Sequence, residues 1–539
     1  MVNMHRFLRR ACLCLAVLMF ALVALAFLVP LVLALLPALT HTQERLAFSF
    51  SALARTAGFT LTQSLLSVAV ALLLGFPAAF FLSQRRFFGQ RFLYALSAVP
   101  FCVPTLIMAL GFIATFGMAG WYNRWLMTLF KMREPPLTFL YSFWGIVLTQ
   151  GFYNFPLVMV TVASLWTQLD TTVEQSAQLL GASPWRTFRT VTLPRLGSAI
   201  ASSCIPVFLY CFFSFMIVLL FGKTGTTTLE VALYHAGRSM KTPRTVAVLA
   251  GIETACACAV LALSTRLEKN AWRTAGLSFA SQSKLESRKT IAKLELIPAS
   301  VLGLLVLFGF LLPLASICTA SFVQKNHVSL DAWRRLVSMN GFWFAVKNTF
   351  ATASATALCC TVTAFVYAVF LRLCGAHTNQ TLLKTIPLLP MALSSVVMGI
   401  GLTMLVRRGS PMVLVLAQTA LTWPFAFRQI FPYLAKIPDE VIGAAALLSQ
   451  SRTDTIFCIL MPYTVRGIAS SFGFCLALSA GDATLPLVLA IPRFDTLSLF
   501  TYRLAGSFRF AEASASGCLL GCLCMVPFFI FQRERRSGI

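Results

Sequence analysis

The chain has 539 residues, of which 58% are apolar and 11% are charged. Soluble domains carry about 25% charged residues, so this composition argues against a soluble enzyme and predicts an integral membrane protein. The net charge of +26 arises from small basic clusters between apolar runs. Such clusters are typical of topology signals and lipid-headgroup contacts, and they do not favour nucleic acid as a partner.

Apolar runs long enough to cross a bilayer recur along the whole chain. They lie near 11–36, 59–82, 93–116, 142–165, 199–221, 243–264, 297–322, 345–370, 384–406, 412–435, 467–490 and 513–532. The sequence therefore predicts an all-α integral membrane protein with about 12 transmembrane helices. Basic clusters at both ends and the even number of spans place both termini in the cytoplasm. The segment 117–140 is then outside and the basic stretch 265–294 inside.

The two halves of the chain repeat each other. A shift of 268 positions superposes Pro156 on Pro424, Pro194 on Pro462 and Tyr234 on Tyr502. Further upstream a shift of 290 relates Pro100 to Pro390, so the first half carries an insertion, which we assign to 117–140. Repeats with an even number of spans share one orientation, and two facing halves imply a central pathway.

A polar, helix-forming segment follows the fourth span of each half. In the first half, residues 169–194 contain a helix start near Asp170, a break at Gly181, a second start at Ser183 and a proline, Pro194, expected to stop the helix. Residues 437–462 repeat this order in the second half. Each segment is predicted to form a helix-break-helix on the cytoplasmic face.

These two segments resemble the EAA loop of permease subunits in binding-protein-dependent ABC importers. That pattern is a Glu-Ala-Ala triplet, three residues, a glycine, and a hydrophobic stretch ending in Leu-Pro. The positions that match or neighbour it are Glu174, Gln175, Ala177, Gly181 and Pro194, then Glu440, Ala444, Ala445, Ser449 and Pro462. The motif glutamate is replaced by Gln175 and Gly443, and the glycine by Ser449. The resemblance covers nearly the whole chain, as a fused double permease of two tandem six-helix repeats.

The resemblance implies a division of the chain and a set of partners. The parts are a first transmembrane helix with its outer loop (1–58), a first permease core (59–264), a cytoplasmic linker (265–296), a seventh helix with its outer loop (297–344) and a second core (345–539). Each loop would form a coupling helix on one of two cytoplasmic ATPase subunits. The chain has no phosphate-binding GxxxxGK[ST] loop, so ATP and Mg²⁺ are expected on that partner and no cofactor on this chain.

Among fused permeases the chain is most similar to the thiamine permease group, with iron(III) permeases next. The similarity rests on residues 221–234, on the Gly481-Asp482 pair and on the Asp495-Thr496-Leu497 run. It implies an inner-membrane importer whose substrate is selected mainly by a separate periplasmic binding protein. A secondary transporter is the rival class, but it requires no paired cytoplasmic helices of this kind.

Four residues are candidates for the pathway. Glu253 and Asp482 are ionisable groups at membrane depth, where charge is costly and often functional. Phe155 and Trp423 lie at matching Pro-flanked sites and could stack on a flat ring. The alternatives are a helix–helix hydrogen bond for Glu253, capping by Asp482, and packing beside a kinked backbone for the aromatic pair.

Overall fold

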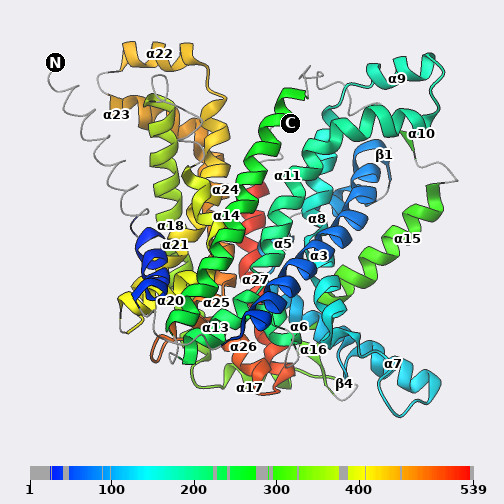
Figure 1. The fold of residues 1–539 in the computed structure, drawn as a ribbon, viewed down its shortest axis with the longest axis vertical. Helices are drawn as coiled ribbons and strands as arrows, with labels where there is room; N and C mark the ends of the chain where they lie inside the picture. Colours follow the sequence, from blue (N-terminus) through cyan, green and yellow to red (C-terminus); the bar gives the residue numbers. More distant parts are fainter. Residues whose placement is uncertain are drawn as a thin grey trace.

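The computed structural model describes residues 25, 27–40, 48–87, 89–96, 99–222, 227–239, 243–274, 289–290, 295–324, 327–374, 386–406, 408–449 and 452–533. Within these residues helices dominate (Figure 1). Two short strand pairs accompany them: β1 (Arg85–Arg86) runs parallel to β2 (Lys289–Thr290), and β3 (Val323–Gln324) is antiparallel to β4 (His327–Val328). The all-α prediction is confirmed.

The helices of the first half follow in chain order. After a helix at Phe27–Thr40, whose last turn is α2 (Pro37–Thr40), they are α3 (Phe50–Gln84), α4 (Gln90–Leu96), α5 (Val99–Cys102), α6 (Thr105–Phe116), α7 (Trp121–Phe130), η1 (Phe139–Tyr141), α8 (Phe143–Gln168), α9 (Thr172–Leu179), α10 (Pro184–Thr187), η2 (Phe188–Thr192), α11 (Leu193–Phe212), α12 (Met216–Phe221), α13 (Leu229–Ser239) and α14 (Pro243–Thr274).

The second half repeats the main helices of the first but, among the described residues, has α17 (Asp331–Val337) before its second span and no counterpart of α7 and η1. Its helices are α15 (Leu296–Val306), η5 (Leu307–Leu311), α16 (Leu312–Phe322), α17, α18 (Phe342–Cys374), η7 (Ile386–Ala392), α20 (Ser395–Leu405), α21 (Pro411–Ala435), α22 (Asp439–Leu448), α23 (Arg452–Thr455), η8 (Ile456–Leu460), α24 (Met461–Gly481), α25 (Thr484–Leu489), α26 (Leu497–Gly506) and α27 (Phe510–Arg533).

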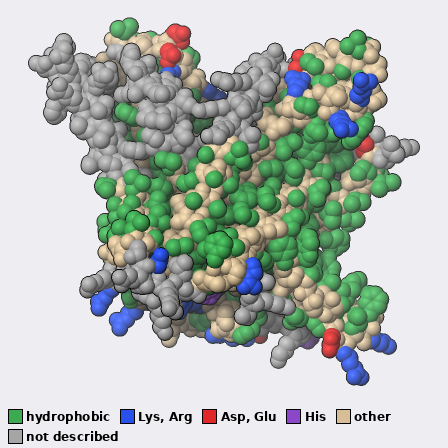
Figure 2. Space-filling model, viewed as in Figure 1, with side chains coloured by type: hydrophobic (Ala, Val, Ile, Leu, Met, Phe, Trp, Pro, Cys, Tyr) green, Lys and Arg blue, Asp and Glu red, His purple; other side chains and the backbone are tan. Residues whose placement is uncertain are grey.

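Helices that can cross a membrane account for the predicted spans. Nine in the described part of the chain are long and apolar enough by themselves. The helix at Phe27–Thr40, α20 and the 25-residue α21 occupy the other three predicted places. Figure 2 shows a belt of hydrophobic side chains between two ends where charged side chains gather. About twelve spans are therefore present, as the apolar runs predict; residues 11–24 of the first run lie outside the described residues.

The fifth and eleventh spans begin and end earlier than the sequence predicts. Pro194 and Pro462 do not stop a helix; they lie in the first turns of α11 and α24. Each proline follows a π-helical turn, a local change of hydrogen bonding that lets a membrane helix continue through a proline. Single π-helical turns, η2 and η8, connect each cytoplasmic segment directly to its span. The fifth span consequently ends at Phe212, and α12 is a separate short helix.

The same hydrogen bond fixes equivalent places in the two halves. The N–H of Leu229, at the start of α13, donates to Thr60 Oγ1 on α3 at 2.9 Å. The N–H of Leu497, at the start of α26, donates to Thr349 Oγ1 on α18 at 2.6 Å. Leu229 and Leu497 are related by the 268-residue shift, so the internal repeat of the sequence is also a repeat of tertiary contacts.

The first span of each half packs against the helices of the other half. The backbone of Pro313 on α16 lies against Gly111 of α6, where a Cβ would clash, and Thr115 Oγ1 donates to Ser316 Oγ at 2.8 Å. In the opposite direction, the backbone of Pro30 lies against Gly401 of α20. Gly111 and Gly401 are themselves repeat equivalents. The two halves are thus interlocked through their first helices.

The linker is attached to the first half at one end. α14 continues to Thr274, beyond the end predicted for the sixth span. Arg85 Nε donates to Glu295 Oε2 at 2.7 Å and the two side chains form an ion pair. This hydrogen bond raises the pKa of the Arg85 guanidinium. Residues 275–288 and 291–294 of the predicted linker lie outside the described residues.

Candidate functional site

The first cytoplasmic segment is a helix-break-helix. α9 ends at Leu179, and Gly181 takes a φ of +88°, a left-handed conformation that favours glycine. Ser183 then caps α10, accepting the N–H of Arg186 at 3.3 Å. Pro184 occupies the first turn of α10, a position suited to proline.

The second segment makes its break differently. α22 ends at Leu448, and Ser449 is extended, with φ −81° and ψ 141°. The Ser449 hydroxyl lies 2.7 Å from the hydroxyl of Thr455 in α23. Because the backbone does not enter the left-handed region here, a serine fits where the first half requires a glycine.

Polar contacts hold both segments to the membrane helices. In the first, Thr192 Oγ1 donates to Glu174 Oε1 at 2.7 Å, and Arg195 donates to the carbonyl of Asp170 at 3.1 Å. In the second, Arg372 of α18 donates to the carbonyl of Ile437 at 2.7 Å and pairs with Asp439 at 2.6 Å. Figure 1 shows α9 and α10 at the same end of the molecule as α22 and α23.

Each segment exposes two leucines just before its break. Leu179 and Leu180 are 88% and 89% exposed, and their repeat equivalents Leu447 and Leu448 are 88% and 87% exposed. Leucine pairs presented at one end of the molecule, beyond its apolar belt, are typical of a surface that binds another protein. The motif comparison did not single out these four residues. Their signal in the sequence was the same Leu-Leu pair at the same register in both halves.

The predicted loop residues lie around these leucines. Gln175, Gly181, Pro194, Glu440 and Ala444 are exposed. Glu174, Ala177 and Ser449 are half-buried, and Ala445 is buried against the rest of the segment. The remaining member, Pro462, is exposed at the start of α24.

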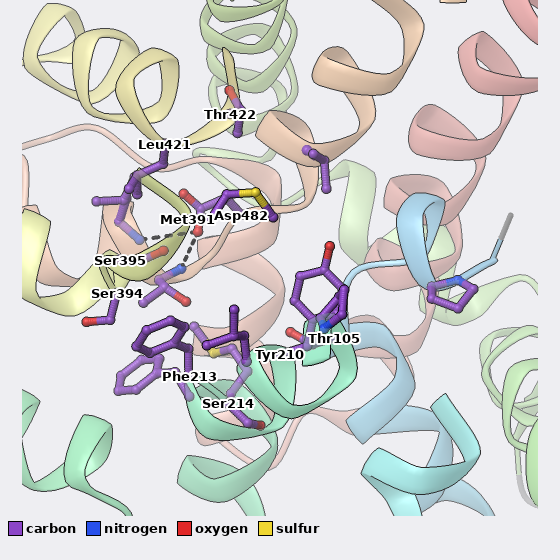
Figure 3. Close-up of a pocket in the computed structure, with 18 of the residues that line it drawn as sticks. Thr105, Tyr210, Phe213, Ser214, Met391, Ser394, Ser395, Leu421, Thr422 and Asp482 are labelled. Atoms are coloured by element: carbon purple, nitrogen blue, oxygen red, sulfur yellow. Dashed lines mark hydrogen bonds between the residues drawn. The ribbon is translucent and has the colours of Figure 1, made fainter. Parts of the chain in front are cut away.

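A cavity of about 320 Å³ lies between the halves (Figure 3). Its wall combines α8, α11 and the Phe213–Phe215 break of the first half with η7, α21 and the Asp482 break of the second. In Figure 3, Tyr210, Phe213 and Ser214 lie across from Met391, Ser394 and Asp482. Several aromatic side chains line it: Tyr153, Tyr210, Phe213, Phe215 and Phe425.

Asp482 is the acidic residue of this wall. Its Oδ1 accepts the N–H groups of Thr484 at 2.9 Å and Leu485 at 3.3 Å, so it caps α25. Its Oδ2 accepts from Gln418 Nε2 at 3.2 Å. Asp482 therefore fulfils the capping alternative while its carboxylate also lines the cavity.

The residues that line the cavity are related by the internal repeat, but the two halves contribute different chemical groups. The 268-residue shift relates Gln150 to Gln418, Asn154 to Thr422, and Ser214 to Asp482, and all six line the cavity. Ser214 and Asp482 each donate their backbone N–H to the residue three before, Cys211 and Ser479, at 3.3 Å. The backbone breaks are thus alike, and the negative charge is confined to the second half.

The other three pathway candidates lie away from this wall. Phe155 is fully buried and packs edge-on against Phe310, with ring centroids 5.5 Å apart. Trp423 is 2% exposed and packs edge-on against Tyr367 at 5.6 Å. Glu253 is buried on α14. Of the four, the structure brings only Asp482 to the cavity as described.

Known proteins resemble this chain over most of its length. Residues 71–267 match the family of binding-protein-dependent transport system inner membrane components. The thiamine transport system permease protein of Salmonella typhimurium is 26% identical over 498 residues, which cover 88% of each chain. That of Brucella abortus is 26% identical over 499 residues, 90% of this chain and 88% of the relative. A putative 2-aminoethylphosphonate permease of Salmonella typhi is 32% identical over 175 residues, 32% of this chain and 61% of the relative.

The family match lies in the first half, and the full-length relatives extend the likeness through the second. In this family the ATPase is a separate subunit, and the permease is a multi-pass protein of the inner membrane. The secondary-transporter alternative is thereby set aside. Residues 71–267 thus resemble the inner-membrane components of binding-protein-dependent transport systems, and the similarity to thiamine transport permeases extends over 88% of the chain.

Proposed function

We propose that this permease imports thiamine or a closely similar organic cation, driven by ATP hydrolysis on its partner subunits. The observation that carries the substrate is the cavity between the halves, where aromatic side chains surround one carboxylate, Asp482. Aromatic faces and a carboxylate attract an organic cation with flat rings. The full-length relatives named as thiamine permeases support the same substrate.

Iron(III) is a poorer fit to the same wall. A bound transition metal needs several nitrogen, oxygen or sulfur ligands in defined geometry. Among the described residues that line the cavity, Asp482 is the acidic one, and no histidine or cysteine accompanies it. The wall provides one negative charge and several rings, which favours an organic cation over an unchelated metal ion.

The two exposed leucine pairs are proposed to bind two copies of a cytoplasmic ATPase. α9 and α22 would each insert their leucines into one ATPase subunit, while ATP and Mg²⁺ bind to that partner and no cofactor binds this chain. A periplasmic binding protein would deliver substrate at the opposite end, beside α7 and α17. This orientation places both termini and the linker in the cytoplasm.

The test is substrate-stimulated ATP hydrolysis by the whole complex in lipid vesicles. We expect the binding protein with thiamine to stimulate hydrolysis and uptake, and iron(III) or 2-aminoethylphosphonate to do neither. Native mass spectrometry should give one permease with two ATPase subunits. Equal stimulation by iron(III) would refute the substrate, and a single bound ATPase would refute the stoichiometry.

A further inference from the structure

Two carboxylic acids are buried together within the first half. Glu230 lies in the first turn of α13 and Glu253 in the middle of α14, and each is 1% exposed. Their carboxyl groups are within hydrogen-bonding reach of each other. Neither residue lines the cavity as described, and the coupling segments do not use them.

The pair has few partners in the described part of the chain. The Glu230 carboxyl accepts the N–H of Val396 at 3.4 Å and lies within hydrogen-bonding reach of the Ser394 hydroxyl, while both oxygens of Glu253 have no donor among the described residues outside the pair. The ion pairs of the described residues do not include either glutamate. Two unpaired negative charges this close, away from water, would repel strongly.

The charged and titratable side chains of the surrounding helices leave the pair uncompensated. Cys256 is the neighbour on the same helix, and Arg238 of α13 donates instead to Tyr234 at 2.9 Å. Arg244 begins α14 nine residues before Glu253, about 13 Å along the helix. The helices that pack against α13 or α14 carry few other titratable side chains. These are His235 on α13 itself, Arg55 on α3, and Arg195, Cys204, Tyr210 and Cys211 on α11, while α2, η7 and α20 carry none.

A single proton satisfies this geometry. With a proton on Glu253, its O–H donates to Glu230, and the remaining negative charge on Glu230 faces the N-terminal end of α20. Backbone N–H groups and the helix dipole favour a negative charge at that position. A metal cation fits poorly, because hard divalent ions need about six oxygen ligands and a backbone N–H donor points into this site.

We propose that Glu230 and Glu253 share one proton and form a proton-binding site where α13 and α14 of the first half meet α20 of the second. The site lies directly behind the cavity wall, because Ser394 caps α20 and both Ser394 and Ser395 line the cavity. The 268-residue shift puts Ser498 and Gly521 at the equivalent positions. The site is therefore a property of one half, and proton release would push α13, α14 and α20 apart beside the cavity.

The experiment is infrared spectroscopy of the full chain bound to its ATPase, recording the C=O stretch of protonated carboxyl groups. To remove any contribution from the cavity, the spectra are recorded in the Asp482→Asn background. We expect a protonated carboxyl band at neutral pH, and we expect this band to disappear as the pH rises. Glu253→Gln should lower the intensity of the band by the contribution of one carboxyl group. Glu512→Gln is the matched control and should leave the band unchanged, because Glu512 pairs with Arg335 and Arg509 at 2.9 and 3.5 Å.

Thermal unfolding gives a second measurement that does not depend on substrate. A proton held by the folded state stabilises it below the pH of release, so the unfolding temperature should fall as the pH rises, and less so in Glu253→Gln. Absence of a protonated carboxyl band at neutral pH in the Asp482→Asn protein with both glutamates intact overturns the proposal, even if the Glu253→Gln variant fails to fold. A band that Glu253→Gln leaves unchanged, or stability that follows sodium concentration and not pH, overturns it as well.

Discussion

Gly181 is the residue on which the geometry of the first cytoplasmic segment depends. Its φ of +88° is costly for any residue with a Cβ, and open space surrounds the position, so a substitution acts through the backbone and the docking surface. We expect Gly181→Glu to insert normally but to weaken ATPase binding about tenfold or more, since about 1–2 kcal/mol of backbone strain is enough for that change. The measurement is co-purification of the ATPase together with uptake.

Two controls accompany this variant. Gly181→Asn keeps a residue that tolerates the left-handed region and should retain the ATPase. Gly197→Glu places the same side chain at an open helical position on α11 and should also be near the parent. Transport at the parent rate by Gly181→Glu, with its ATPase bound, would contradict the coupling role of this segment.

Asp482 combines a structural task with a position in the cavity. Asp482→Asn keeps an oxygen acceptor for the N–H groups of Thr484 and Leu485 but removes the negative charge. We expect import of a cationic substrate to fall about tenfold or more, because hydrogen bonds and contacts to a charged group contribute about 1.5–3 kcal/mol. ATPase assembly should be unchanged.

Asp482→Leu serves as the comparison because it removes both the charge and the cap. It should lower the unfolding temperature as well as transport. Unchanged import by Asp482→Asn, with loss of folding in Asp482→Leu, would leave Asp482 with the capping task alone.

At the level of helices, contact between the first span and α20 depends on a glycine. A Cβ at Gly401 would collide with the backbone of Pro30, and backbone cannot move aside as a flexible side chain can. We expect Gly401→Val to lower the free energy of unfolding by about 1–3 kcal/mol or more. Differential scanning fluorimetry in detergent measures the accompanying fall in the unfolding temperature.

The control at this scale is Gly58→Val on α3, where open space surrounds the glycine. This substitution should lower the free energy of unfolding only by the small helix-propensity penalty of a β-branched residue. Gly111→Val should resemble Gly401→Val, because Gly111 meets Pro313 in the equivalent contact. Equal unfolding temperatures for Gly401→Val and Gly58→Val would refute the interlocking contact.

Hydropathy was sufficient to predict the number and order of the helices, and less so their ends. An apolar run indicates that a segment is buried in lipid or protein, but it does not show where a helix within it ends. Phe212 and Gly481 end their helices inside such runs. Local sequence does not reveal the first of these breaks, since Phe213–Phe215 is largely as apolar as the helix before it, whereas Asp482 carries a capping signal for the second. The same holds for the interlocked first spans, because the contact of Gly111 with Pro313 joins residues far apart in the chain.

For the whole molecule, the orientation in the membrane is the main testable quantity. We expect a cysteine introduced at Met132, exposed beyond α7, to react with a membrane-impermeant reagent from outside. One at Gln178, exposed on α9, should react only after the membrane is opened. Asn123 is unsuitable for labelling because it is fully buried and its Nδ2 donates to the carbonyls of Gly117 and Leu137.

Both variants are made in a cysteine-free background, so the native thiols do not contribute. A maleimide with a fluorescent group provides the signal. Labelling of Met132→Cys only from the cytoplasm would reverse the topology.

Interlocking also has a consequence for how the protein is made. A ribosome delivers residues 50–274 to the membrane well before residues 296–322, yet α6 and α8 bury surface against η5 and α16. Until the seventh span is made, Gly111 and Phe155 of the first half lack the contacts with Pro313 and Phe310 that cover them in the finished protein. A nascent chain halted after residue 274 should be degraded by membrane proteases faster than the finished protein, and supplying the remaining residues as a second polypeptide should protect it.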